Sequence, residues 1–305
     1  FVKTDLIDQF FGFYHKKIKN KYILLTHNSD KAITFNEIKY LDEKIIHWFA
    51  MKLDYPMDDK ISPLPSGLEN RRFLANGRIK NFNSILKNHS FKNKPKENSI
   101  LCSFNVHTNF DTRNSLLEQV RADEKVQIKK FNKNIEYLNA LTNYKYILCP
   151  EGNNFESHRI WESLIFGCTP ILIKNNVNVN FNKIGVPMIL LENWQMLSDY
   201  GFDNLNELNI LNSEKNYLEF STWKYWKERI DSKKIYWYTV NTFFYLVIKK
   251  EYKIFGKKIV ITGGLGYIGM ELSKLYSGKS RNNEIIVIDN NFYSQRVSQL
   301  KRWNI

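Results

Sequence analysis

Short apolar segments alternate with helical patterns along most of the chain. Runs rich in β-branched, aromatic and aliphatic residues favour buried strands at residues 22–26, 61–65, 99–106, 144–149, 169–173 and 188–191. Apolar residues at the spacing of one helical face favour helices at residues 6–18, 41–51, 112–122, 157–166 and 222–249. Strands and helices that alternate in this way predict an α/β fold.

A polar stretch at residues 87–98 carries no apolar period and is typical of a linker. It divides the pattern into an N-terminal lobe over residues 1–95, expected to lack its first strand, and a second lobe over residues 96–255. A third unit is predicted over residues 256–305, because residues 257–262 are a new apolar strand that runs into a glycine-rich turn.

The segment at residues 149–170, CPEGNNFESHRIWESLIFGCTP, has the character of a strand end, a polar loop, a helix and a second strand. In an open parallel sheet such a loop lies at the carboxyl ends of the strands, where ligands bind. The segment is therefore the main candidate for a binding site.

The residue types in this loop suit a diphosphate. Gly152 and Asn153 permit close approach of the backbone, and Ser157 adds a hydroxyl beside free N–H groups at a helix start. Arg159 would place a planar guanidinium against phosphates. Glu162, one turn along the same face, could accept hydrogen bonds from a ribose diol. The alternative for Arg159 and Glu162 is an ordinary exposed ion pair on a helix.

The motif from residue 149 to residue 171, with its Pro-Glu-Gly-Asn loop, His158-Arg-Ile-Trp-Glu162 and Gly-Cys-Thr-Pro, resembles the donor-binding signature of exostosin-like glycosyltransferases. The resemblance implies two Rossmann-like lobes of GT-B type and a UDP- or GDP-linked sugar donor. It also implies a glycan acceptor, no bound metal and inversion at the anomeric carbon. By this resemblance Arg159 contacts the diphosphate, Glu162 the ribose, and His158 lies at the donor.

Glu151 departs from the pattern, because related loops often carry Arg or Lys at this position. Arg113, just inside the preceding predicted helix, is expected to replace the lost positive charge.

An inverting transfer needs a base that takes the proton of the acceptor hydroxyl. Asp30, after the strand at residues 22–26, and Glu69 are the candidates. A turn or helix-capping role is the alternative for an Asp in that place. His158 could also bind phosphate or serve only its loop.

The glycine pattern Gly263-x-x-Gly266-x-x-Gly269 follows a strand and opens a helix, and Asp289 ends the next strand. This geometry is typical of a dinucleotide site, and it resembles the start of the extended short-chain dehydrogenases, the NAD(P)-dependent nucleotide-sugar epimerases and dehydratases. The catalytic Tyr-x-x-x-Lys of that family has no counterpart after Asp289, so we expect no redox chemistry from this unit alone.

The chain contains 45 Lys and Arg against 31 Asp and Glu, a formal net charge of +14. Such a charge could serve nucleic acid, an anionic surface or phosphorylated substrates. Lysine is spread along the chain, and neither zinc-finger spacing nor an arginine-rich tract accompanies it. We therefore expect nucleotide phosphates, and not nucleic acid, as partners.

Cys102, Cys149 and Cys168 lie in or beside apolar strands without CxxC spacing, which is typical of core residues in a reducing compartment. The most apolar late stretch, residues 235–248, is shorter than the roughly 20 residues of a transmembrane helix. We expect a cytoplasmic protein that could act at the inner face of a membrane. The sequence does not indicate an oligomeric state.

These patterns together predict a glycosyltransferase fused to the start of a nucleotide-sugar epimerase or dehydratase. Two alternatives stay open. One is an NAD-dependent epimerase or dehydratase with residues 1–255 as a recognition module, and the other is a non-enzymatic polyanion-binding module.

Overall fold

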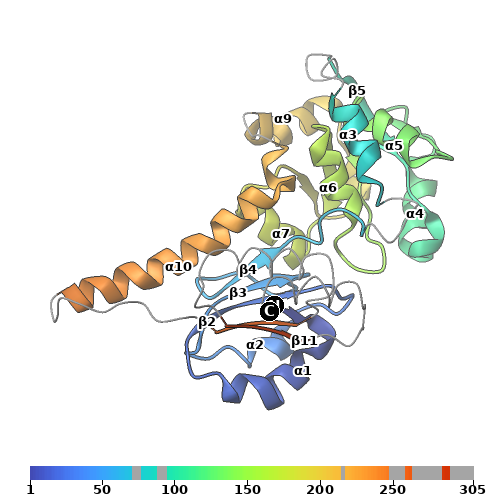
Figure 1. Ribbon diagram of the computed structural model, residues 1–305. Helices are drawn as coiled ribbons and strands as arrows, with labels where there is room; N and C mark the ends of the chain where they lie inside the picture. Colours follow the sequence, from blue (N-terminus) through green and yellow to red (C-terminus); the bar gives the residue numbers. More distant parts are fainter. Residues whose placement is uncertain (71–76, 88–94, 214–216, 247–257, 263–283, 289–305) are drawn as a thin grey trace. The chain divides into compact units, whose positions relative to one another are not determined.

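The computed structural model describes residues 1–70, 77–87, 95–213, 217–246, 258–262 and 284–288 (Figure 1). The chain forms two compact units. The first unit comprises Phe1–Met51, Met57–Leu64 and Arg229–Ile305, and the second comprises Lys52–Pro56 and Pro65–Glu228. The units hold parallel sheets of four and five strands respectively, which confirms the predicted α/β fold with two Rossmann-like lobes.

The first unit is built on four parallel strands in chain order. They are β1 (Val2–Lys3), β2 (Tyr22–His27), β3 (Ile45–Met51) and β4 (Ile61–Leu64). Its helices are short, with α1 (Ile7–Gln9) continuing into a π-helical turn at Phe10–Tyr14, and α2 (Phe35–Ile38) closed by a capping box. The predicted helix at residues 6–18 is therefore a series of short helical turns.

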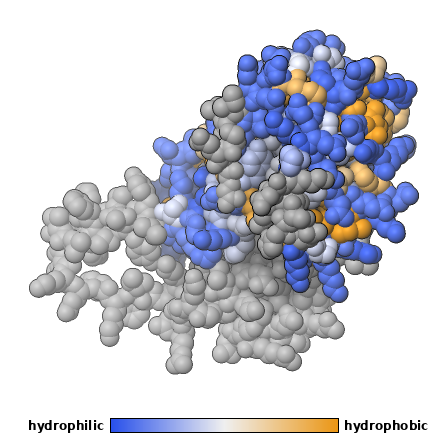
Figure 2. All heavy atoms as spheres, turned by 90° about the horizontal axis from the view of Figure 1, so that it is seen from above, coloured by the Kyte–Doolittle hydropathy of each residue, from blue (hydrophilic) through white to orange (hydrophobic). Residues whose placement is uncertain are grey.

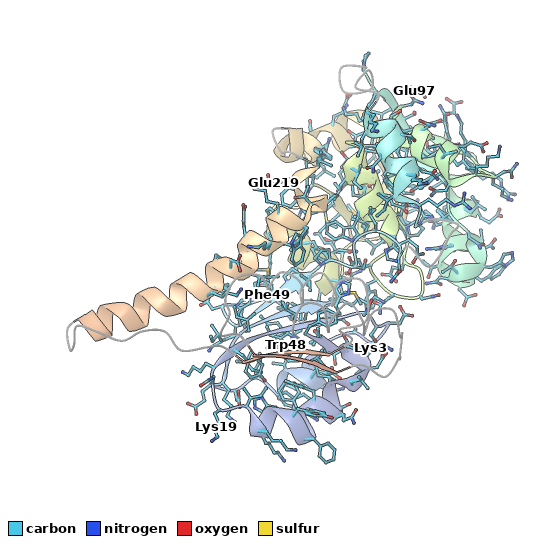
Figure 3. All side chains as sticks on the ribbon, viewed as in Figure 1. Lys3, Lys19, Trp48, Phe49, Glu97 and Glu219 are labelled. Carbon is cyan, nitrogen blue, oxygen red and sulfur yellow. The ribbon has the colours of Figure 1, made fainter. Side chains whose placement is uncertain are left out.

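The predicted helix at residues 41–51 is wrong, because Ile45–Met51 forms β3, an inner strand of the sheet. Trp48 and Phe49, labelled in Figure 3, are successive residues and are both buried. Successive side chains of a strand point to opposite faces of a sheet, so both faces of β3 are covered. A strand buried on both faces shows no apolar alternation, so the apolar pattern of residues 45–51 does not distinguish a strand from a helix.

The second unit has five parallel strands in the order β6-β5-β7-β8-β9. They are β5 (Glu97–Cys102), β6 (Val126–Ile128), β7 (Tyr144–Leu148), β8 (Thr169–Ile173) and β9 (Ile189–Leu191). The helices are α3 (Ile79–Lys87), α4 (Phe110–Val120), α5 (Asn134–Leu141), α6 (His158–Ile165), α7 (Asn176–Lys183), α8 (Gln195–Asp199), α9 (Phe202–Ser213) and the first part of α10 (Trp223–Leu246). Of these, α3, α5 and α6 pack together, and α4 packs against α8.

This strand order has a switch point between β5 and β7. The chain leaves β5 toward β6 on one side and returns to β7 on the other side. In an open parallel sheet a crevice for ligands lies at the carboxyl ends of the two strands at such a point. The loop at residues 149–157, which follows β7, is thus at the place where this fold binds ligands.

The core of the second unit joins the sheet to its helices. Buried residues from the sheet, such as Tyr146, Leu148 and Ile171, pack with Leu116 of α4 and Leu197 of α8. The three cysteines are buried and free, as predicted for core residues. On the face seen in Figure 2, the coloured surface residues are mostly hydrophilic, and hydrophobic residues lie in small groups.

Near the C-terminus, β10 (Lys258–Thr262) and β11 (Glu284–Ile288) pair in parallel. The three glycines of the predicted dinucleotide site, Gly263, Gly266 and Gly269, and Asp289 lie outside the described residues. Among the described residues, no helix combines the length and the apolar character that crossing a bilayer requires.

Candidate functional site

Arg113 on α4 holds the loops after β5 and β7 together at the switch point. Its guanidinium donates to the backbone carbonyl oxygens of Asn105 at 2.7 Å, Glu151 at 2.8 Å and Pro150 at 3.4 Å. Asn109, next to α4, donates to the carbonyl of Gly152 at 3.2 Å. Backbone groups in a loop need partners when they are buried, and here a buried arginine supplies them.

These contacts give Arg113 a structural role that the sequence did not indicate. Burial, followed by the charge of Arg159, lowers the pKa of Arg113 to about 10. The nearness of two guanidinium groups concentrates positive charge beside the loop. The contact of Arg113 with phosphate stays a prediction.

Gly152 is required by this packing. A Cβ at this position would lie 3.0 Å from Nη2 of Arg113, whose own hydrogen bonds keep it from moving away. The neighbouring Asn153 is exposed. The loop therefore presents backbone, and not a side chain, where it meets Arg113.

The start of α6 carries polar atoms that have no hydrogen-bond partner among the described residues. Ser157 is the N-cap residue, yet its hydroxyl makes no capping bond, and its Oγ is buried without a partner. Nε of Arg159, two residues on, is also buried without a partner. Buried donors are normally satisfied, so these atoms indicate the place of a ligand that accepts hydrogen bonds.

Glu162 lies one turn further along α6 and is buried. Burial raises its pKa, while the charges of Arg159 and His158 oppose the rise. The predicted Arg159–Glu162 pair is thus not an exposed surface ion pair. The side chains are coupled within the site, with the hydroxyl of Tyr137 as a further buried neighbour.

Residues 65–70, the segment that follows β4, contact the start of α6. Nδ1 of His158 lies 2.6 Å from the carbonyl oxygen of Gly67, and its Nε2 lies 3.5 Å from Oε1 of Glu69. Glu156 accepts hydrogen bonds from the backbone N–H of Ser66 at 2.7 Å and from its hydroxyl at 2.8 Å. The structure therefore brings Glu69 beside His158 in one unit.

Glu156 is the main site residue that sequence reasoning missed. Its Oε1 also accepts from Nε1 of Trp161 at 2.6 Å, and its Oε2 is buried without a partner. Burial raises its pKa despite these hydrogen bonds. Nothing in the local sequence distinguishes Glu156 from an acid near a helix start, because its partner Ser66 is 90 residues away.

Asp30, the other candidate base, is exposed in the loop after β2 and belongs to the first unit. Gly152, Asn153, Ser157, His158, Arg159 and Glu162 are together on one loop and helix start, and Arg113 and Glu69 contact that loop and helix.

A pocket of about 230 Å³ opens at the carboxyl ends of β7, β8 and β9, and it was not predicted. It is lined by Thr112, Glu151, Ile173, Glu192, Asn193 and Trp194. Glu151 lies both in this pocket and in the loop that Arg113 holds, so pocket and loop are parts of one region. Within the described ranges, no group of three or more His, Cys, Asp or Glu is arranged to hold a metal ion.

The second unit is therefore a Rossmann-like lobe with a candidate ligand site at the switch point of its sheet. Residues 96–235 match the family described as the RXYLT1 C-terminal domain, a glycosyltransferase-related domain of ribitol xylosyltransferase. No curated protein matches the chain. The match covers the loop, α6 and the pocket, and it supports a glycosyltransferase that uses a sugar donor and an acceptor. It offers no support for an epimerase or for NAD(P).

Proposed function

We propose that the chain is a pentosyltransferase that moves xylose, or a closely related sugar, from a nucleotide donor to an acceptor hydroxyl. The family match over residues 96–235 supports the class of reaction. The observation that carries the site is that Nε of Arg159 and Oγ of Ser157, both at the start of α6, are buried with no hydrogen-bond partner in the described part of the chain.

The diphosphate of the donor fits this arrangement. The free backbone N–H groups at a helix start and its positive dipole end favour an anion. Arg159 adds a full charge with a planar set of donors, which suits phosphate oxygens. Negative charge grows on the diphosphate as it leaves, so donors fixed in place beforehand stabilise the transition state more than the ground state.

Glu162 is proposed to accept hydrogen bonds from the ribose hydroxyls. Its carboxylate is buried, and an acid in that setting gains from donors that a bound ribose would supply. The protein's own cations would balance the diphosphate, so we propose a reaction that needs no metal ion and inverts the anomeric centre. We propose a ribitol-containing or glycan acceptor.

Calorimetric titration tests the donor site. UDP, GDP and CDP are titrated into the wild-type chain and into Arg159→Met and Glu162→Gln. The exposed Arg121 supplies a matched control, Arg121→Met. We expect one nucleoside diphosphate to bind, Arg159→Met to weaken it about 10²-fold through lost charge-assisted hydrogen bonds, and Arg121→Met to leave it unchanged.

Equal binding of the diphosphate to wild type and Arg159→Met would show that Arg159 does not bind the diphosphate. The same titration with NAD tests the epimerase alternative, whose glycines lie outside the described residues. Preferred binding of NAD that survives Arg159→Met would favour that alternative. Transfer is then measured as release of UDP from UDP-xylose, with ribitol 5-phosphate as the first acceptor probe.

A further inference from the structure

We propose that His158 and Glu69 together form the base that takes the proton of the acceptor hydroxyl, and that Glu156 positions this pair. The inference rests on the proposed glycosyl transfer and adds the proton acceptor. The sequence predicts His158 as a donor-binding residue and Glu69 as a separate candidate base, whereas the inference gives them one shared role.

The hydrogen bond to Gly67 determines which nitrogen of His158 is free. A carbonyl oxygen can only accept, so Nδ1, at 2.6 Å from the Gly67 oxygen, carries a hydrogen. In the neutral ring Nε2 then holds a lone pair. Nε2 faces Oε1 of Glu69 at 3.5 Å, which places two proton-accepting atoms side by side.

Protonation of Nε2 would change the contact between His158 and Glu69. When Nε2 gains a proton, a repulsion between lone pairs becomes an ion pair between imidazolium and carboxylate. The pair thus has the properties of a base that holds a proton while the transfer takes place.

The pair is open to substrate, whereas the group that positions it is not. The side chains of His158 and Glu69 are 38% and 23% exposed, so an acceptor hydroxyl can reach them. Glu156 is 5% exposed and cannot touch a substrate from its present position.

Glu156 fixes the segment that carries Glu69. Its Oε1 receives the backbone N–H and the hydroxyl of Ser66, and Trp161 of α6 donates to the same oxygen. One buried oxygen therefore joins residues 65–70 to the helix that bears His158. Gly67, between Ser66 and Glu69, has φ +67°, a conformation that glycine adopts without strain.

The base and the phosphate-binding cation project in different directions. His158 and Arg159 are successive residues of a helix, and neighbours in sequence do not share a helical face. The charge of Arg159 interacts with Arg113 and Cys149, whereas the ring of His158 contacts Gly67 and Glu69. An inverting displacement needs this separation, because the acceptor attacks opposite to the leaving diphosphate.

The proton and electrons balance in a single step. The acceptor oxygen gives its proton to Nε2 of His158 and forms a bond to the anomeric carbon. The bond from that carbon to the phosphate oxygen breaks, and its electron pair leaves with the nucleoside diphosphate. Glu69 stabilises the imidazolium, which later returns the proton to solvent.

Two substitutions remove the base and keep its surroundings. In His158→Asn, the amide nitrogen takes the place of Nδ1 and can still donate to Gly67, while Nε2 is absent. Glu69→Gln removes the charge with little change of shape. His107→Asn and Glu124→Gln, both at exposed positions of the second unit, are the matched controls.

Each variant is tested by calorimetry with UDP and by release of the nucleoside diphosphate, UDP or GDP, from a panel of UDP- and GDP-linked pentoses and hexoses. We expect His158→Asn to lower kcat about 10²-fold or more, the usual range for loss of a general base, while the UDP dissociation constant stays within about twofold. Glu69→Gln should lower kcat less and move the acid limb of the kcat profile to lower pH, since the imidazolium loses its partner.

Glu156→Gln retains an acceptor for Ser66 and Trp161, whereas Glu156→Ala does not. Their comparison tests positioning: Ala should lower kcat and Gln should restore most of it, with UDP affinity preserved in both. Among the neighbouring charges, Glu156 and Glu162 interact with His158, and Glu162 also interacts with Glu69.

Retention of kcat within about threefold in His158→Asn would overturn the inference, because a general base contributes more than this. If His158→Asn fails to fold, Glu69→Gln decides, and an unchanged pH profile in that variant overturns it as well. A chain that binds no diphosphate, or that releases none from any sugar donor, refutes the proposed function itself. Loss of kcat with UDP affinity intact separates the two cases.

Discussion

The two arginines of the site should respond to substitution in opposite ways. Arg113 is 3% exposed and satisfies backbone carbonyls at 2.7, 2.8 and 3.4 Å, whereas Nε of Arg159 is buried without a partner. We therefore predict that Arg113→Met lowers stability, and that Arg159→Met removes donor binding without loss of stability.

The magnitude follows from these contacts. Hydrogen bonds from a charged donor contribute about 1.5–3 kcal/mol each, and Arg113 makes two short ones. Burial lowers its pKa to about 10, so folding disfavours its charge and offsets part of this sum. We expect a net loss of about 3 kcal/mol in the free energy of unfolding, which lowers Tm by roughly 6–12 °C for a domain of this size.

Arg159→Met should leave Tm unchanged or raise it. A buried donor without a partner costs about 1–3 kcal/mol, and methionine removes that donor while it fills similar space. Arg121→Met is the control, because Arg121 is 64% exposed and pairs with Glu118 on the surface. The free energy of unfolding of Arg121→Met should stay within about 0.5 kcal/mol of the wild-type value.

Thermal unfolding followed by circular dichroism, combined with calorimetry of UDP, gives both readouts. The reasoning is refuted if Arg113→Met has the same Tm as Arg121→Met, since the three carbonyl contacts of Arg113 would then contribute nothing to stability. It is equally refuted if Arg159→Met melts far below wild type and binds UDP as tightly.

Three further substitutions test the surroundings of the site. Gly152→Ala should lower Tm and weaken UDP binding, because its Cβ would meet Arg113 at 3.0 Å, whereas Gly12→Ala, with no atom within 4 Å, should do neither. Glu156→Gln should stabilise the fold at neutral pH. Burial raises the pKa of Glu156, so wild type loses stability as pH rises above the ordinary carboxyl pKa of about 4.3. The difference in Tm between variant and wild type should therefore grow from pH 4 to pH 7. A difference in Tm that is independent of pH would contradict this. Lys96→Met should lower the free energy of unfolding by about 1.5–3 kcal/mol in a urea titration, because Nζ donates to three backbone carbonyls after α5; an unchanged midpoint would contradict it.

The local structure around the loop could be predicted from the residue pattern alone. The strand, polar loop, helix and strand predicted at residues 144–173 are β7, the loop, α6 and β8. These elements could be read because β7 and β8 are short apolar runs and α6 has one apolar face, and each pattern is set by neighbours in the chain. The motif also placed Ser157, His158, Arg159 and Glu162 together, since Ser157 is the N-cap residue of α6 and the other three lie in its first two turns.

The contacts of these side chains depend on packing between segments that are distant in the chain. The carbonyl partners of Arg113 are 8 to 38 residues away in sequence, and the segment that holds His158 is about 90 residues away. Glu156 became a site residue only when Ser66 was packed against it. β3 could not be recognised because burial on both faces removes the alternation that identifies a strand. Periodicity records which face of an element is buried, whereas the partners in a hydrogen bond depend on how distant segments of the chain are brought together by the sheet.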